Sequence, residues 1–141
     1  MVFVRNAWYV AGWSSEFDND LSVVKILDEN IVMFRTSKGQ VIAMEDRCPH
    51  RFLPLSMGKL IGDDIQCGYH GITYNCEGVC VRIPGQKKIQ KTLHVPTYLV
   101  YEQNDIVWIW MGENSLAELP SVVGCTKLTW AGSTRFSATF R

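Results

Sequence analysis

The sequence has no apolar run that could cross a bilayer. Its longest, over residues 106–111, is far shorter than the about 20 residues that a membrane helix needs. The formal net charge is zero, with 14 basic and 14 acidic side chains, so nothing points to nucleic acid or to a membrane surface as a partner. The N-terminus has no basic segment followed by an apolar one, so we expect no secretory signal. These absences together predict a cytoplasmic protein.

Histidine and cysteine are also few, at 3 and 5 residues. So few cysteines make a disulfide framework a poor hypothesis. A chain of 141 residues that is 47% hydrophobic and 20% charged is expected to form one domain with an ordinary core.

Short β-like runs separated by turn signals dominate, and no long helical periodicity competes with them. We expect a strand over 7–13, a hairpin of 22–27 with 31–36 that turns at 28–30, and a return strand over 40–45. Further hairpins are expected for 59–61 with 65–67, 71–74 with 79–82, and 98–102 with 106–110. This pattern predicts an all-β, antiparallel fold.

Two short motifs carry the chemistry of the chain. Cys48 and His50 form the pattern C-x-H, and Cys67 and His70 form C-x-x-H after a gap of sixteen residues. Thiolates and imidazoles are the side chains that hold soft or borderline transition metals. The expected hairpin 59–67 leads from one pair to the other, so the sequence predicts a metal site built by two loops.

The spacing bears on which metal is bound. Structural zinc usually takes its close ligand pairs as two Cys or two His, whereas each pair here mixes the two. A mixed pair suits a dinuclear centre, in which the two Cys serve one iron and the two His serve the other, as in a Rieske [2Fe–2S] cluster. A zinc-binding interaction module stays open as the alternative.

The stretch CPHRFLPLSMGKLIGDDIQCGYHGITYNCEGVCVRIPG, preceded by NAWYVAGWSSEF, resembles the Rieske non-haem iron oxygenases, and most of all the aromatic O-demethylase type represented by vanillate demethylase oxygenase. The resemblance implies a Rieske-type antiparallel β-sandwich with a small cluster-binding subdomain of two ligand loops. It places the Rieske domain at residues 1–111, with the subdomain at about 46–86. Residues 112–141 then form a linker and the start of a catalytic domain, which the clean alternation over 134–141 also suggests.

The same resemblance assigns roles at the site. Cys48 and Cys67 would hold one iron of the cluster, and His50 and His70 the other. Gly68 and Gly71 would let the backbone approach the cluster and aim N–H groups at its sulfurs. Pro84 and Gly85 resemble a third loop that covers the cluster in this family.

Four positions indicate the kind of Rieske centre. High-potential relatives carry a loop-linking disulfide at the positions of Leu53 and Tyr69, and a Ser that donates to the cluster at the position of Ile72. Tyr74 keeps the place of their cluster-facing Tyr. Because hydrogen bonds to the sulfurs tune the potential, the missing donor predicts a low potential, roughly −150 mV.

One part of the resembled enzymes is missing. They activate dioxygen at a mononuclear iron held by two His and one carboxylate, but only His94 remains here once His50 and His70 are assigned, and no H-x₄-H pair exists. The sequence therefore predicts electron transfer, as the electron-entry domain of an aromatic-compound monooxygenase or O-demethylase, and not a complete oxygenase. A free-standing Rieske ferredoxin is the alternative.

The resemblance also implies partners. A flavin-containing reductase or a ferredoxin would donate electrons, and a mononuclear-iron catalytic domain, that of a neighbouring subunit, would accept them across the exposed edge of the two His. The intact protein is expected to be a homotrimer, whereas the 141-residue chain is expected to associate weakly.

The remaining candidates have simpler interpretations. Cys76 and Cys80 are expected to be small buried or half-buried residues, His94 an ordinary strand or surface residue, and Cys125 has no assigned role. Arg51 could face a redox partner or the solvent. Four tryptophans are interpreted as core aromatics: Trp8, Trp13, Trp108 and Trp110.

Overall fold

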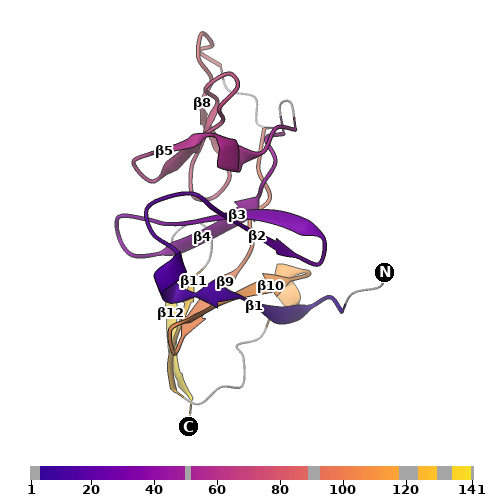
Figure 1. Cartoon of the computed structure of the whole chain (residues 1–141), viewed down its shortest axis with the longest axis vertical. Coiled ribbons are helices and arrows are strands. Elements are labelled where there is room, and N and C mark those ends of the chain that lie inside the picture. The colour runs from indigo at the N-terminus through magenta and orange to yellow at the C-terminus, as the bar shows by residue number, and fades with distance from the viewer. Residues whose placement is uncertain (1–3, 50–51, 89–92, 118–123, 130–134, 141) are drawn as a thin grey trace.

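The computed structural model describes residues 4–49, 52–88, 93–117, 124–129 and 135–140. Within these ranges the regular structure consists of antiparallel strands and short 3₁₀ turns, in three sheets that follow one another along the long axis (Figure 1). None of the described residues belongs to a helix long and apolar enough to span a membrane. The expected all-β, antiparallel fold is confirmed.

In the two smaller sheets, neighbouring strands also follow one another along the chain. The large sheet instead pairs the first strand with strands from the C-terminal part. The large sheet has the order β1-β10-β9-β11-β12, the second β2-β3-β4 and the third β5-β6-β7-β8. The first sheet contains β1 (Ala7–Trp13), β9 (Val100–Gln103), β10 (Ile106–Met111), β11 (Gly124–Thr129) and β12 (Arg135–Phe140); the second β2 (Ser22–Ile26), β3 (Glu29–Arg35) and β4 (Val41–Glu45); the third β5 (Lys59–Ile61), β6 (Asp64–Gln66), β7 (Thr73–Tyr74) and β8 (Cys80–Arg82).

The turn between β2 and β3 differs from its prediction. Leu27 and Asp28 occupy it with φ of 51° and 63°, and Ile26 pairs directly with Glu29. Two central residues at positive φ match the right-handed twist of the flanking strands. The expected turn over 28–30 is therefore wrong: it begins one residue earlier and ends two residues earlier, because the pairing resumes directly after a two-residue turn.

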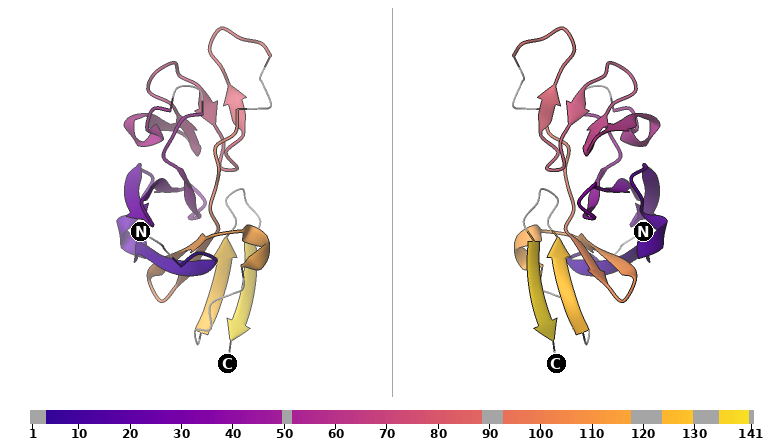
Figure 2. Two further views of the ribbon diagram at one scale, coloured as in Figure 1. Left: turned by 90° about the vertical axis from the view of Figure 1, so that its right-hand side faces the viewer. Right: turned by 90° about the vertical axis from the view of Figure 1, so that its left-hand side faces the viewer.

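The middle sheet is buried on both of its faces. Along β3, Ile31 and Met33 pack toward the large sheet, whereas Val32 and Phe34 pack toward the third sheet and its loops. β4 divides its side chains in the same way, so both strands are nearly continuous apolar runs, as expected of strands covered on two sides. The domain is thus three layers with two cores, and Figure 2 shows the layers from either side.

The segment after residue 93 joins the third sheet to the middle one. Val95 N–H donates to Gly78 O at 2.8 Å, and two residues of the middle sheet bond the same segment, Glu45 N–H to Pro96 O at 2.9 Å and Tyr98 N–H to Ala43 O at 3.0 Å. A Cβ on Gly78, whose φ is +78°, would collide with Val95 O. The loop-bearing third sheet is therefore fixed to the rest of the domain by backbone contacts.

The C-terminal part contains more structure than its sequence suggested. The weak patterning of residues 112–133 predicts a linker with one short helical turn near residues 116–118, and in the structure β11 also forms within them and pairs with β9. The expected turn is the 3₁₀ turn η3 (Asn114–Leu116). The final strand predicted over 134–141 corresponds to β12.

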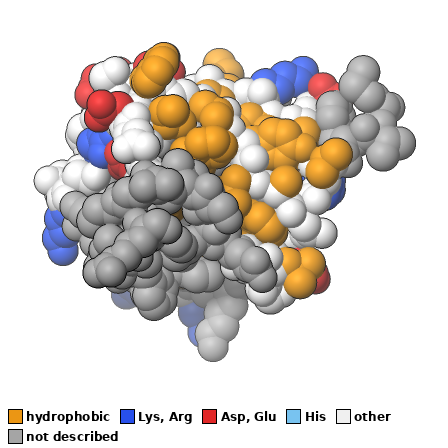
Figure 3. Space-filling view, turned by 90° about the horizontal axis from the view of Figure 1, so that it is seen from below, with side chains coloured by type: hydrophobic (Ala, Val, Ile, Leu, Met, Phe, Trp, Pro, Cys, Tyr) orange, Lys and Arg blue, Asp and Glu red, His pale blue; other side chains and the backbone are white. Residues whose placement is uncertain are grey.

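The four tryptophans predicted to be core aromatics lie on strands of the large sheet, and none of them belongs to the two core clusters described above. Trp8 packs its ring against those of Trp110 and Tyr101, at centroid distances of 5.5 and 5.8 Å. Trp110 is buried, Trp8 and Trp108 are half-buried, and Trp13 is 58% exposed. The prediction of a core position is therefore wrong for Trp13, which stands at the end of β1. Seen from below, hydrophobic side chains gather over this end of the molecule (Figure 3).

Arg35, at the end of β3, connects three parts of the domain. Its guanidinium donates to Phe17 O at 2.8 Å, Ser14 O at 2.9 Å and Gly39 O at 2.8 Å. It also pairs with Glu102 of β9, at 3.0 Å, and the side chains are only 24% and 27% exposed. Most of its hydrogen-bonding capacity is therefore used within the protein.

We expect Arg35→Ala to lower the free energy of unfolding by about 3 kcal/mol, because it leaves three carbonyls and one carboxylate without a charged donor. The measurement is urea unfolding followed by circular dichroism. Arg5→Ala is the control, since Arg5 pairs with Glu29 at 3.3 Å in an ion pair that is 50% and 39% exposed and should contribute less than about 1 kcal/mol. Equal losses in the two variants would contradict the interpretation.

Candidate metal centre

The first ligand loop begins directly after β4 and folds back on itself. Cys48 N–H donates to Leu53 O at 2.7 Å, and Phe52 N–H donates to Cys48 O at 2.6 Å. These two bonds close the loop and bury Cys48 completely. His50 and Arg51 lie outside the described residues, so their predicted roles remain predictions.

Phe52 holds the closing turn in an uncommon conformation. Its φ is 58°, in the left-handed region that a bulky residue rarely adopts. The guanidinium of Arg47 lies 4.0 Å from the centre of its ring, a cation–π contact that stabilises the arrangement. The ring is nevertheless 63% exposed, so the loop presents an apolar side chain to the solvent.

The second ligand loop connects β6 to β7 in a similar closed turn. Cys67 N–H donates to Ile72 O at 2.8 Å, and Gly71 N–H donates to Cys67 O at 3.2 Å. Gly71 has φ of +72°, which only glycine adopts at low cost. The turn directs Cys67 inward, where it is 3% exposed, and leaves His70 exposed with its ring 3.9 Å from that of Tyr69.

The two cysteine thiols meet in the core between the middle and third sheets. Burial raises the pKa of the Cys67 thiol, and its hydrogen bond with the Cys48 thiol raises the pKa further. The backbone N–H groups of Tyr69 and His70 hydrogen-bond the Cys67 thiol and lower its pKa. Backbone donors therefore already point at a sulfur of the site, as the glycines of this loop led us to expect.

Tyr74, on β7, contacts the other thiol. Its hydroxyl lies 3.3 Å from Cys48 Sγ, and the side chain is fully buried. Burial raises the pKa of Tyr74 above its ordinary value, and the hydrogen bond with Cys48 adds to the effect. The hydroxyl therefore keeps its proton and can donate to a metal-bound sulfur at this position.

Besides the two thiols, backbone atoms of the two ligand loops also approach each other closely. Gly58 follows the 3₁₀ turn η2 (Leu55–Met57), and a Cβ on it would collide with Gln66 O and lie 3.1 Å from Gly68 N. A Cβ on Gly68 would lie 3.0 Å from Met57 O. A side chain at either glycine would separate the loops, so these residues set the distance between the two ligand pairs.

Pro84 lies against the second loop, with its Cγ 3.2 Å from the place where Gly71 would carry a Cβ. The segment expected to cover the site is thus in contact with it.

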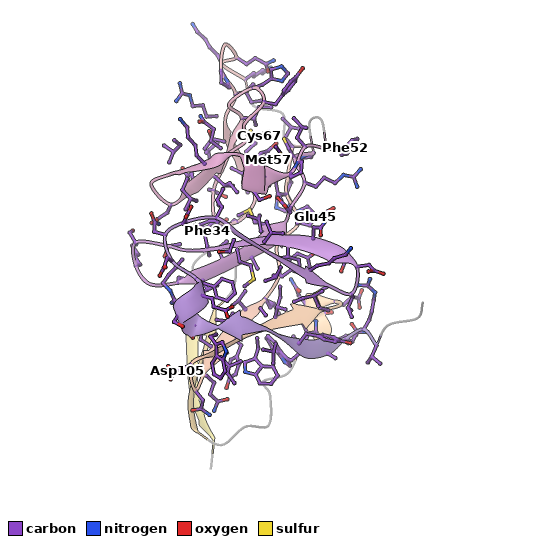
Figure 4. The ribbon with its side chains drawn as sticks, viewed as in Figure 1. Phe34, Glu45, Phe52, Met57, Cys67 and Asp105 are labelled. Carbon is purple, nitrogen blue, oxygen red and sulfur yellow. The ribbon has the colours of Figure 1, made fainter. Side chains whose placement is uncertain are left out.

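A shallow apolar hollow on the surface is lined by Leu53, Pro54, Met57, Gly68 and Tyr69. Figure 4 shows Phe52, Met57 and Cys67 together at the upper end of the molecule, away from Asp105 at the lower end.

The other cysteines and the third histidine have ordinary surroundings. Cys76 is half-buried and its thiol, whose pKa burial raises to about 11, donates to Asp63 O at 3.2 Å. Cys80 is buried, with its thiol 3.7 Å from Arg82 O. His94 is exposed and pairs with Val79 through an isolated bridge. These environments agree with the structural roles expected from the sequence.

In the part of the chain that the structure describes, no three His, Cys, Asp or Glu residues gather to hold one metal ion. The donors described there, Cys48, Cys67 and His70, fit three of the four ligand positions of a dinuclear cluster, and the fourth, His50, lies outside the described residues. Two buried thiols lie side by side for one iron, and His70, whose backbone N–H hydrogen-bonds the Cys67 thiol, has an exposed side chain that would serve the other. Thiolate and imidazole on separate irons is the Rieske arrangement.

The fold and this donor set define an iron–sulfur protein, and comparison with known families gives the same answer. Residues 7–98 match the family model described as the Rieske [2Fe-2S] domain. The chain belongs to this family.

Relatives among characterised proteins narrow the class further. The chain is 42% identical, over 86% of its length, to the iron–sulfur subunit of the toluene-4-sulfonate monooxygenase system of Comamonas testosteroni. It is 38% identical, over 92% of its length, to the vanillate O-demethylase oxygenase subunit of a Pseudomonas species. It covers only 35% and 36% of these two proteins, so it spans about a third of the length of its relatives.

Solved structures show the same relationship. Dicamba monooxygenase bound to dicamba superposes with a TM-score of 0.82 at 38% identity, covering 86% of this chain and 37% of that one. An oxygenase–ferredoxin complex of carbazole 1,9a-dioxygenase gives 0.71 at 32% identity. The resemblance to the Rieske oxygenases, including the O-demethylase type, is confirmed, and with it the [2Fe–2S] cluster as the cofactor of the domain.

We expect Tyr74→Phe to lower the reduction potential by about 40 mV, because a donor to sulfur stabilises the more negative, reduced state. A hydrogen bond contributes about 1 kcal/mol, and a tenfold change in equilibrium is 59 mV for one electron. The measurement is a redox titration followed by EPR. Tyr101→Phe is the control, since Tyr101 is equally buried but donates to Gln103 Oε1 at 2.8 Å in another part of the domain. An unchanged potential in Tyr74→Phe would show that the hydroxyl does not donate to the cluster.

Proposed function

We propose that this chain is the electron-entry domain of an oxygenase that acts on aromatic compounds, by monooxygenation or O-demethylation. The observation that carries the proposal is the pair of buried thiols, with His70 exposed in the loop that holds one of them, in a domain related to oxygenase components. The relatives act, by their names, on toluene-4-sulfonate, dicamba and vanillate, so we infer an aromatic acid as the substrate class of the whole protein.

We assign four ligands: Cys48 and Cys67 on one iron, and His50 and His70 on the other. When bound, the [2Fe–2S] cluster supplies reversible one-electron chemistry at the imidazole-held iron. The chain buries both Cys away from water, the backbone of the second loop donates to Cys67, and the Tyr74 hydroxyl, 3.3 Å from Cys48 Sγ, would donate to a metal-bound thiolate there. The exposed edge of His70 gives a partner access, and its second ring N–H can couple a proton to the electron.

We infer a low potential for this centre, roughly −150 mV. Leu53 and Tyr69 occupy the positions of the disulfide of high-potential relatives, and their side chains are 36% and 57% exposed. Ile72 replaces the hydroxyl donor of those relatives and is buried. Tyr74 and the backbone remain as donors, which suits electron delivery to oxygen chemistry.

For the organisation of the chain, we propose a Rieske domain over residues 1–111, with its cluster-binding subdomain at about 46–86. Residues 112–141 then lead toward a catalytic part. The relatives described above are oxygenase components, and this chain spans about a third of their length. That relation favours the oxygenase domain over a free-standing ferredoxin.

We propose a flavin-containing reductase or a ferredoxin as the electron donor, and the mononuclear-iron part of a neighbouring subunit as the acceptor. The oxygenase–ferredoxin complex found for carbazole 1,9a-dioxygenase supports a donor of this kind. The whole protein is expected to be a homotrimer, with most of the contact made outside this chain. Sedimentation of the cluster-loaded chain should therefore give a monomer at micromolar concentration, and a stable trimer would contradict this assignment of the contact.

The ligand assignment predicts that Ala at position 48, 50, 67 or 70 abolishes cluster binding, because one iron then loses one of its two protein ligands. Cys76→Ser and Cys80→Ser are the matched controls and should keep the cluster. Iron and sulfide content and the EPR signal of the reduced protein measure the outcome. A reduced Rieske signal that survived Ala at two of the four positions would show that the assignment is wrong.

The proposed function predicts that the cluster-loaded chain takes up one electron from a flavin-containing reductase and passes it to an acceptor. It should not convert an aromatic substrate, because His94 is the only His left for a second iron site. Stopped-flow absorbance measures the reduction, and chromatography measures the product. Oxygen-dependent product from the purified chain would overturn the division into electron-entry and catalytic parts.

A further inference from the structure

The carboxylate of Asp46 joins the two ends of the first ligand loop. The side chain of Asp46 accepts two hydrogen bonds from Ser56, one from its backbone N–H and one from its hydroxyl, both at 2.7 Å. The two residues flank the segment that contains Cys48 and His50. Hydrogen bonds to an ionised acceptor are among the stronger ones in proteins, so this pair holds the two ends of the loop together.

Asp46 is itself held by the middle sheet. It directly follows β4, and its N–H donates to Asn30 O of β3 at 3.0 Å. The preceding residue, Glu45, donates its N–H to Pro96 O at 2.9 Å. The carboxylate therefore projects from a fixed backbone, and Ser56 is positioned relative to the most buried strands of the domain.

Ser56 is connected to the second ligand loop through the 3₁₀ turn η2 and Gly58. It belongs to η2, which ends where Gly58 N–H donates to Leu55 O at 2.9 Å. Gly58 is the residue that packs, backbone to backbone, against Gln66 and Gly68 beside Cys67. Movement of Ser56 would therefore move the contact that sets the separation of Cys48 from Cys67.

We propose that Asp46 and Ser56 are positioning residues for the cluster, whose paired hydrogen bonds fix the distance between the two ligand loops. The inference rests on the proposed function only in taking Cys48 and Cys67 as ligands. Neither side chain needs to touch the cluster. Their effect is to keep the loops closed over it and thereby to slow its loss.

The chain contains a matched control for this pair. Asp63, in the turn between β5 and β6, accepts from Ser37 N–H at 2.8 Å and from its hydroxyl at 2.7 Å. The chemistry and geometry are the same, but this pair joins two turns and encloses neither ligand loop. General destabilisation by loss of such a pair can thus be separated from an effect on the cluster.

The experiment compares Ser56→Ala and Asp46→Asn with Ser37→Ala and Asp63→Asn in the whole 141-residue chain, loaded with iron and sulfide. The readouts are the rate of iron loss to a chelator, the EPR g-values of the reduced state, and the urea midpoint. We expect Ser56→Ala to lose iron about tenfold faster than the unmodified chain, as the loss of one bond to a charged group implies, with Asp46→Asn at least as fast and with shifted g-values. Ser37→Ala and Asp63→Asn should lose iron at the unmodified rate, whatever their urea midpoints.

Equal rates of iron loss in Ser56→Ala and Ser37→Ala would overturn the inference while leaving the proposed function intact. Should Asp46→Asn fail to fold, Ser56→Ala decides the question, because it removes one hydroxyl and keeps the backbone bond. If the unmodified chain took up iron and sulfide without a Rieske EPR signal, the proposed function would fail, and this inference with it.

Discussion

The double burial of β3 and β4 is the constraint on which the rest of the structure depends. Because their side chains alternate between two cores, neither strand can shift by one residue without exchanging the contents of both. Ile31 and Met33 belong to one core, and Val32 and Phe34 to the other. This sheet is therefore the fixed reference for the large sheet on one side and for the ligand loops on the other.

Only a few residues separate each cysteine of the site from the end of a strand. Cys48 lies three residues beyond the end of β4, and Cys67 directly follows β6, so each thiol continues from a strand into the core. The second loop then reverses within a few residues, and His70 in it is exposed to the solvent. The two thiols are thus shielded from water, whereas the His70 side of the second loop is accessible from outside the domain.

Local patterns predicted what local forces determine. The antiparallel hairpins and the structural environments of Cys76 and Cys80 follow from spacing and turn chemistry, whereas the four-ligand assignment remains a prediction. Patterns failed where distant contacts decide: β11 forms by pairing with β9, and Trp13 is exposed because its strand ends at the edge of the core. The Asp46–Ser56 pair also joins residues with no periodic relation, so only the folded backbone reveals it.

The absence of a disulfide between the ligand loops explains why so many weaker contacts converge there. A covalent link at the positions of Leu53 and Tyr69 would hold the loops together by itself. Without it, closure depends on the backbone contact of Gly58 with the second loop, on the stacking of Arg47 with Phe52, and on hydrogen bonds within each loop. Each such interaction contributes about 1 kcal/mol, so the loops stay closed only because several act on the same short segments. Leu53 and Tyr69 instead contribute apolar side chains to the surface hollow at the edge of the site. A disulfide at these two positions would leave less apolar surface there.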